Sequence, residues 1–141
     1  MIKFYRKHEE IINYLIVGVL TTIISMIVKL GLLYTILNAS NPIDVQIAEI
    51  TSWVIAVAFA YVTNKIFVFK SKSTKILKEL LEFVSGRIVT LLIGMFIMWF
   101  ICNLLNLNSD LWVFIATMIE QVVITILNYI ISKIIVFKKA S

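Results

Sequence analysis

Long apolar stretches separated by short polar breaks form the main pattern of this sequence. Four of them are long enough for a helix to cross a bilayer, which takes about 20 mostly apolar residues; they cover residues 11–37, 45–69, 83–105 and 111–137. Residues 38–44 (NASNPID) and 106–110 (NLNSD) separate the members of each pair, and both have the composition of turns. The pattern predicts an all-α integral membrane protein with four transmembrane helices.

The composition supports a membrane protein of one domain, residues 1–141. The chain has 141 residues, 61% of them hydrophobic, and a mean hydropathy of +1.01. A soluble domain of this length would expose much of this apolar material to water, so that class is excluded. The first apolar stretch contains Lys29 and lacks a small-residue cleavage pattern, so we expect it to remain in the mature protein.

Positive charges gather at one end of every predicted helix. Twelve of the thirteen Lys and Arg residues lie before the first helix, around the middle loop or at the end of the chain. The two short breaks carry only Asp44 and Asp110. Cationic residues stay in the cytoplasm during insertion, so both termini and the middle loop are predicted to be cytoplasmic. The net charge of +5 then describes a surface that attracts anionic lipid headgroups, and no nucleic-acid partner is expected.

Two amphipathic segments, residues 1–10 and 74–82, predict short helices at the cytoplasmic interface. The sequence contains no metal-ligand spacing, no nucleophile–base set and no Gly-rich phosphate loop. We therefore expect no enzymatic activity and no cofactor. The lone histidine, His8, lies in the first amphipathic segment and is interpreted as a surface residue.

The sequence also repeats itself. Residues 64–70 (NKIFVFK) and 132–138 (SKIIVFK) match at five positions with an offset of 68. The starts of the first and third helices also resemble each other, at residues 10–14 and 79–83. We expect two hairpin repeats of the same topology, about residues 10–70 and 79–139, related by an axis along the membrane normal.

Several ionisable and amide side chains fall inside the predicted spans: Lys29, Glu49, Glu120 and Gln121. Charges there cost about 2.5–3.5 kcal/mol each on insertion scales. Lys29 and Glu120 lie at similar depths, about 12 and 14 Å from the outer helix ends at 1.5 Å per residue, so they are candidates for a buried ion pair that lines a polar cavity. Glu49 is a second candidate partner for Lys29. A snorkelling Lys29 and a Glu120 that is protonated or capped by Gln121 remain the alternative.

Near the predicted cytoplasmic ends lies a second polar set, Arg87, Asn64, Asn128, Lys65 and Lys133. A planar guanidinium binds phosphate through two parallel hydrogen bonds, so Arg87 and the two amides predict a site for a lipid phosphate. Lys65 and Lys133 either join this site or snorkel to the interface. Trp53 and Trp99 lie deeper than an aromatic belt and are candidates for contact with a sugar or an acyl chain.

The doubled helix end resembles the signature of the GtrA-like family, Asn-Phe-x-x-Asn-[Arg/Lys]-x-x-[Val/Thr]-Phe. Its first copy is AYVTNKIFVF, which keeps Asn64 but has Ala60 at the first Asn, and its second is NYIISKIIVF, which keeps Asn128 but has Ser132. The stretch FVSGR that ends at Arg87 resembles the start of the family's third helix, and the resemblance covers nearly the whole chain. It implies a single GtrA-like transmembrane domain in the bacterial cytoplasmic membrane.

The resemblance further implies translocation of a polyprenyl-phosphate-linked monosaccharide, such as undecaprenyl-phosphate glucose, for polysaccharide or teichoic-acid glycosylation. The expected partners are that lipid, membrane lipids, a glycosyltransferase and a second copy of the chain. Two other functions are considered. One is a non-transporting adaptor that anchors or regulates a glycosyltransferase. The other is a small multidrug-type antiporter, which is disfavoured because the first helix carries Lys29 where that class has an acidic residue.

Overall fold

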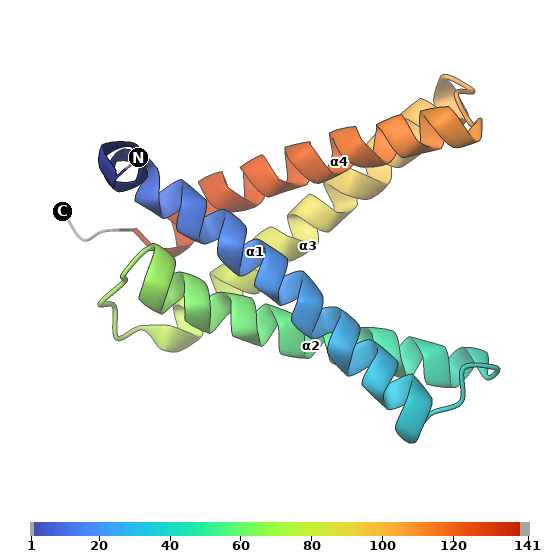
Figure 1. The fold of residues 1–141 in the computed structure, drawn as a ribbon, viewed down its shortest axis with the longest axis horizontal. Coiled ribbons are helices and arrows are strands. Elements are labelled where there is room, and N and C mark those ends of the chain that lie inside the picture. Colours follow the sequence, from blue (N-terminus) through green and yellow to red (C-terminus); the bar gives the residue numbers. More distant parts are fainter. Residues whose placement is uncertain (1, 139–141) are drawn as a thin grey trace. The chain divides into compact units, whose positions relative to one another are not determined.

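Four long helices make up most of the chain in the computed structural model, which describes residues 2–138 and the side chains of residues 8–138 (Figure 1). They are α1 (Ile2–Thr35), α2 (Pro42–Thr63), α3 (Ile76–Trp99) and α4 (Asp110–Ile131). Three of them continue into five-residue π-helices, η1 (Asn64–Val68), η2 (Phe100–Leu104) and η3 (Ser132–Val136). Residues 2–138 contain no strand.

Each of the four helices is long and apolar enough to cross a membrane. The spans are His8–Thr35, Pro42–Val68, Ile76–Leu104 and Asp110–Val136. Most of their large apolar side chains are exposed, as expected for helices whose surroundings are hydrocarbon. The prediction of an all-α protein with four transmembrane helices is confirmed.

The start of α2 follows directly from its sequence. Pro42 occupies the first helical position, where its missing N–H would have no partner in any case. Asn41 is the N-cap, and its Oδ1 accepts the backbone N–H of Ile43 at 3.0 Å. The Asp44 carboxylate then accepts the N–H of Asn38 at 2.8 Å, which closes the turn between α1 and α2.

Of the two predicted interfacial helices, the first is present as a short helix and the second is part of a longer one. The backbone of α1 leaves the helical region at His8, where φ is −120° and ψ is 17°, so a short helix from Ile2 precedes the span; Met1 lies outside the described residues. The segment at residues 74–82 is not a separate helix, because α3 begins at Ile76 and runs unbroken to Trp99. No Pro or Gly interrupts it before Gly86, so nothing in the sequence ends the helix there.

The chain divides into two units, Met1–Ser71 (unit 1) and Lys72–Ser141 (unit 2). Unit 1 contains α1, α2 and η1, and unit 2 contains α3, η2, α4 and η3. The helices α2 and α4 have 22 residues each and begin 68 positions apart, at 42 and 110. The π-helices that follow them also begin 68 positions apart, at 64 and 132.

Small side chains and one aromatic pair form the interior of each unit. In unit 1 the buried residues Ala48, Ser52, Ala56, Ala60 and Asn64 recur every fourth position, and the rings of Tyr14 and Phe69 lie 6.3 Å apart. In unit 2 the corresponding rings, Phe83 and Phe137, lie 6.0 Å apart. Small residues let helices approach closely where lipid supplies no hydrophobic drive.

Glycines of α3 show how closely the two helices of unit 2 pack. A Cβ added at Gly86 would lie 2.7 Å from Cγ2 of Ile131, and one added at Gly94 would lie 2.6 Å from both Oε1 of Glu120 and Cδ1 of Ile124. No side chain larger than hydrogen fits at either place without a shift of its neighbours. The carboxylate of Glu120 therefore lies directly against the backbone of α3.

Candidate functional site

The predicted phosphate-binding residues fall into two groups. Asn64 and Lys65 begin η1 in unit 1, whereas Arg87, Asn128 and Lys133 belong to unit 2. All five lie in the helix halves that are remote from the two short hairpin loops.

A buried hydrogen bond joins α3 to α4. The hydroxyl of Thr90 donates to Oδ1 of Asn128 at 2.8 Å and also lies 3.1 Å from the backbone carbonyl oxygen of Arg87. Thr90 is 1% exposed and Asn128 9%. The sequence predicted Asn128 as a site residue but did not predict its bond to Thr90. The bond fixes the orientation of the Asn128 amide. Its donor, Thr90, lies about one helical turn after Arg87 on α3.

Arg87 lies above an aromatic ring of its own helix. Its guanidinium carbon is 4.6 Å from the ring centroid of Phe83, within cation–π range. Phe83 is buried and packs on Phe137, so the ring is a fixed platform and the half-buried guanidinium is held at a defined place. Since α3 begins at Ile76 and not at the predicted residue 83, Arg87 lies about three helical turns from the start of its helix.

Asn64 is a buried amide with one unused acceptor. Its side chain is 1% exposed, its Nδ2 donates to the carbonyl oxygen of Ala60 at 2.7 Å, and its Oδ1 has no hydrogen-bond partner within residues 8–138. Leaving a buried acceptor unpaired costs about 1–3 kcal/mol. One N–H of the Asn64 amide donates to the carbonyl oxygen of Ala60, and the side-chain atom without a partner is the acceptor Oδ1.

The two lysines that follow Asn64 and Ser132 contact neutral oxygens. Nζ of Lys65 donates to Oγ of Ser71 at 3.4 Å, and Nζ of Lys133 donates to the hydroxyl of Tyr129 at 3.1 Å. Lys133 also lies 5.4 Å from the ring centroid of Tyr129. Both ammonium groups are thus held close to the end of a span.

The predicted intramembrane residues Lys29, Glu49 and Glu120 belong to different units. Lys29 of α1 forms an ion pair with Glu49 of α2, the second of the two partners considered from the sequence. Glu120 lies on α4 against Gly94, and the neighbouring Gln121 is exposed. The Lys29–Glu49 pair is within unit 1 and Glu120 is within unit 2.

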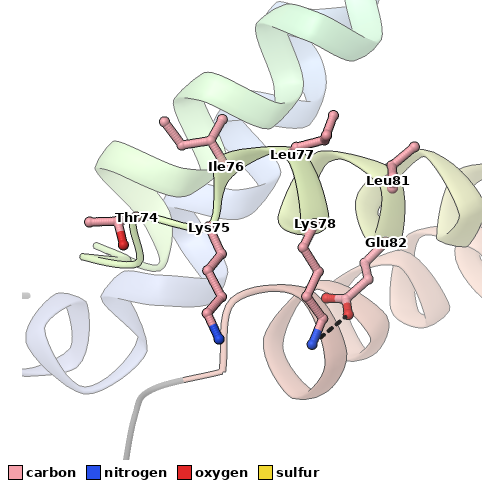
Figure 2. Close-up of a pocket in the computed structure, with 7 residues that line it drawn as sticks. All are labelled: Thr74, Lys75, Ile76, Leu77, Lys78, Leu81 and Glu82. Atoms are coloured by element: carbon pink, nitrogen blue, oxygen red, sulfur yellow. Dashed lines mark ion pairs between the residues drawn. The ribbon is translucent and has the colours of Figure 1, made fainter.

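A groove of about 570 Å³ marks the start of α3, and we call it the α3 groove. Its lining residues are Thr74, Lys75, Ile76, Leu77, Lys78, Leu81 and Glu82. Figure 2 shows the charged ends of Lys75, Lys78 and Glu82 on one side and the apolar side chains on the other. Lys78 pairs with Glu82 at 3.7 Å. Amphipathic faces of this kind lie at membrane interfaces or bind partner helices.

No cluster of His, Cys, Asp and Glu side chains that could hold a metal ion occurs in the part of the chain that the structure describes. Residues 13–137 match the family model described as "GtrA/DPMS, transmembrane domain". The chain belongs to this family.

The sequences of several similar proteins align with nearly the whole chain. The membrane protein YwcD of Bacillus subtilis is 37% identical over 89% of this chain and 94% of its own length. GtcA of Listeria monocytogenes serovar 1/2a, named a cell wall teichoic acid glycosylation protein, is 37% identical over 92% of this chain and 86% of its own. The protein of the same name from Listeria innocua matches to the same extent. No solved structure matches the chain.

Several side chains of this GtrA/DPMS protein bring hydrogen-bonding groups or charge into its spans. Arg87 offers a planar set of donors, Asn64 offers a buried acceptor, and Lys65 and Lys133 add positive charge at span ends. The helices that carry them are apolar enough to span a bilayer.

Proposed function

We propose that this protein moves a polyprenyl-phosphate-linked monosaccharide, such as undecaprenyl-phosphate glucose, across the bacterial cytoplasmic membrane. The sugar would then serve cell-wall polysaccharide or teichoic-acid glycosylation. The teichoic-acid glycosylation proteins among its relatives support this role. The observation that carries the proposal is the set of polar side chains held inside membrane spans, above all the Arg87 guanidinium on Phe83 and the unpaired acceptor of Asn64.

The proposed arrangement places both termini and the middle loop in the cytoplasm. It is supported by the twelve of thirteen cationic residues that lie before the first helix, around the middle loop or at the end of the sequence. The two hairpins are then repeats of one topology. The equal lengths of α2 and α4, their matching π-helices and the aromatic pairs Tyr14–Phe69 and Phe83–Phe137 all support this.

The proposal assigns each unit the chemical group that its own side chains suit. Arg87 binds the phosphodiester of the lipid, because a guanidinium gives two parallel, charge-assisted hydrogen bonds to phosphate oxygens. Asn64 accepts a hydrogen bond from a sugar hydroxyl, because its free atom is an acceptor and an ionised phosphate has only acceptors to offer. Lys65 and Lys133 attract the anionic headgroup to the cytoplasmic interface.

The test is transbilayer movement of undecaprenyl-phosphate glucose in proteoliposomes that contain the purified protein. Wild type should accelerate movement. Arg87→Ala should slow the accelerated movement about tenfold or more, since a hydrogen bond to a charged group contributes about 1.5–3 kcal/mol. Arg87→Lys should recover only part of it, because lysine lacks the planar fork. Lys78→Ala, which removes a cation from the α3 groove, is the matched control and should retain the wild-type rate.

A second function, the adaptor for a glycosyltransferase, is favoured by the α3 groove. Its apolar residues Ile76, Leu77 and Leu81 are all exposed. If the folded wild-type protein accelerates no sugar lipid, and Leu77→Asp abolishes cell-wall glycosylation in cells, the adaptor replaces the translocation proposal. Normal glycosylation in the Leu77→Asp strain would exclude the groove as the contact.

A further inference from the structure

The Lys29–Glu49 ion pair lies inside the apolar part of unit 1, near the hairpin loop. Lys29 is six residues before the end of α1 and Glu49 seven residues after the start of α2. Both are therefore about 10 Å from the hairpin end of their helices at 1.5 Å per residue. The side chains remain 38% and 55% exposed although they pair with each other. The pair thus faces its surroundings with unused hydrogen-bonding capacity.

Stability alone does not explain a half-exposed ion pair at this depth. Replacement of such a pair by apolar residues of similar volume is often neutral or stabilising, because the charges no longer need to be desolvated. An ionisable residue within a span is therefore interpreted first as part of a binding or transport site. An ammonium has three donors and a carboxylate about four acceptor positions, so each partner can still bind a ligand group.

The charge of the pair selects the kind of ligand. A phosphate or another anion would be attracted by Lys29 but repelled by the adjacent Glu49 carboxylate. A neutral polyol suits both, because each hydroxyl can donate to the carboxylate and accept from the ammonium. Trp53 lies four residues after Glu49 on the same face of α2 and is 40% exposed. An indole ring offers an apolar face to the C–H groups of a pyranose and keeps a polar N–H at its edge.

We propose that Lys29, Glu49 and Trp53 form a sugar-binding site in the hairpin-loop half of unit 1. Lys29 and Glu49 bind adjacent hydroxyls of a neutral monosaccharide, and Trp53 stacks on its ring. The inference rests on the proposed function, in which the hairpin-loop half of unit 1 faces outward and the sugar reaches it during translocation. This site would recognise the sugar, whereas Arg87 would bind the phosphate, which is common to all polyprenyl-phosphate-linked sugars.

The test removes the polar groups while the fold is kept. In the double variant Lys29→Met/Glu49→Leu both charges are lost together, so neither is left unpaired. Its movement of undecaprenyl-phosphate glucose in proteoliposomes should fall about tenfold relative to wild type. The charge-swapped variant Lys29→Glu/Glu49→Lys keeps a donor and an acceptor and should retain more of the rate. The matched control Lys78→Met/Glu82→Leu removes the ion pair of the α3 groove and should retain the wild-type rate.

A binding measurement separates this inference from the proposed function. In a Trp99→Phe/Trp112→Phe background, Trp53 is the only tryptophan, and its fluorescence is titrated with methyl glucoside. Saturable quenching, lost in the Lys29→Met/Glu49→Leu variant, is the expected result, and it would support the site even if wild type moved no lipid. A double variant that moves the glucose lipid and binds the glucoside as wild type does would overturn the inference and leave the proposed function standing.

Discussion

The hydroxyl of Thr90 and the amide oxygen of Asn128 are 2.8 Å apart, and both are buried within unit 2. This is a hydrogen bond between α3 and α4 inside two membrane spans. It orients the amide beside Arg87, whose carbonyl oxygen lies 3.1 Å from the same hydroxyl. The Thr90 hydroxyl therefore contacts both Asn128 of α4 and the backbone of the proposed binding residue Arg87.

Thr90→Val should destabilise the protein modestly. The valine keeps the shape of threonine but leaves Oδ1 of Asn128 without its donor. Interhelical hydrogen bonds in membranes contribute about 0.6 kcal/mol on average and up to about 1.7. Unfolding by denaturing detergent in mixed micelles should show a loss in this range, and Thr90→Ser should restore it. A Thr90→Val protein as stable as wild type would mean that the bond is not formed in the membrane.

Gly86→Ala should lower the free energy of unfolding more than Gly18→Ala does. The new Cβ would lie 2.7 Å from Cγ2 of Ile131, a β-branched side chain with one preferred rotamer in a helix. Overpacking of this kind costs about 1–3 kcal/mol. At Gly18 nothing lies within 4 Å of the added Cβ, so alanine there should be neutral or slightly stabilising. Equal unfolding curves for the two variants would contradict the close approach of α3 and α4.

Gly94→Ala should lower the free energy of unfolding by an amount between the effects of Gly18→Ala and Gly86→Ala. The atoms in the way, Oε1 of Glu120 and Cδ1 of Ile124, are the far ends of flexible side chains and can move aside. We expect a loss of less than about 1 kcal/mol in the same unfolding measurement. The combination Gly94→Ala/Glu120→Ala should recover stability, because the shorter side chain leaves room for the methyl group.

Asn64→Ala should separate binding from folding. The Oδ1 of Asn64 has no partner, and the carbonyl oxygen of Ala60 keeps the backbone N–H of residue 64 as a donor. The free energy of unfolding should therefore change by less than about 1 kcal/mol, while accelerated movement of the sugar lipid is lost. Asn128→Ala, which breaks the bond to Thr90, should lower stability as well as transport. A severe folding defect in Asn64→Ala would instead make Asn64 a structural residue.

Cysteine labelling tests the orientation of the hairpins. In a Cys102→Ser background, which has no other cysteine, single cysteines are placed at Ser40, Asn108 and Thr74. A membrane-impermeant maleimide should label positions 40 and 108 in intact cells, and position 74 only after the membrane is opened. Labelling of positions 40 and 74 from the same side would refute the proposed topology.

Hydropathy was sufficient to locate the four spans, because a bilayer demands about 20 apolar residues in a row. The ends of the predicted spans at residues 69, 105 and 137 lie one residue beyond the structural spans that end at Val68, Leu104 and Val136. The π-helices were not predicted, because a change from i→i+4 to i→i+5 bonding leaves no mark on apolar periodicity over five residues. The start of α3 was also missed, since an amphipathic segment and a transmembrane helix can join without a break.

The candidate site was less predictable than the fold. The sequence identified Asn64, Arg87 and Asn128 as unusual polar residues, but it did not show that Thr90 binds Asn128 or that Phe83 underlies Arg87. For Lys29 the sequence left two partners open, because helix depth was the only available criterion and both carboxylates satisfied it roughly. The partner follows from which helices share a hairpin, and adjacent helices α1 and α2 bring Lys29 to Glu49.

The aromatic pair Tyr14–Phe69 lies within unit 1 and the pair Phe83–Phe137 lies within unit 2, and this has a consequence for biosynthesis. Each hairpin carries its own closing contact. Because the chain is made from its N-terminus, Tyr14 and Phe69 both leave the ribosome before Phe83 and Phe137. The insertion machinery therefore handles two successive hairpins, and the closing contact of the first is available before that of the second.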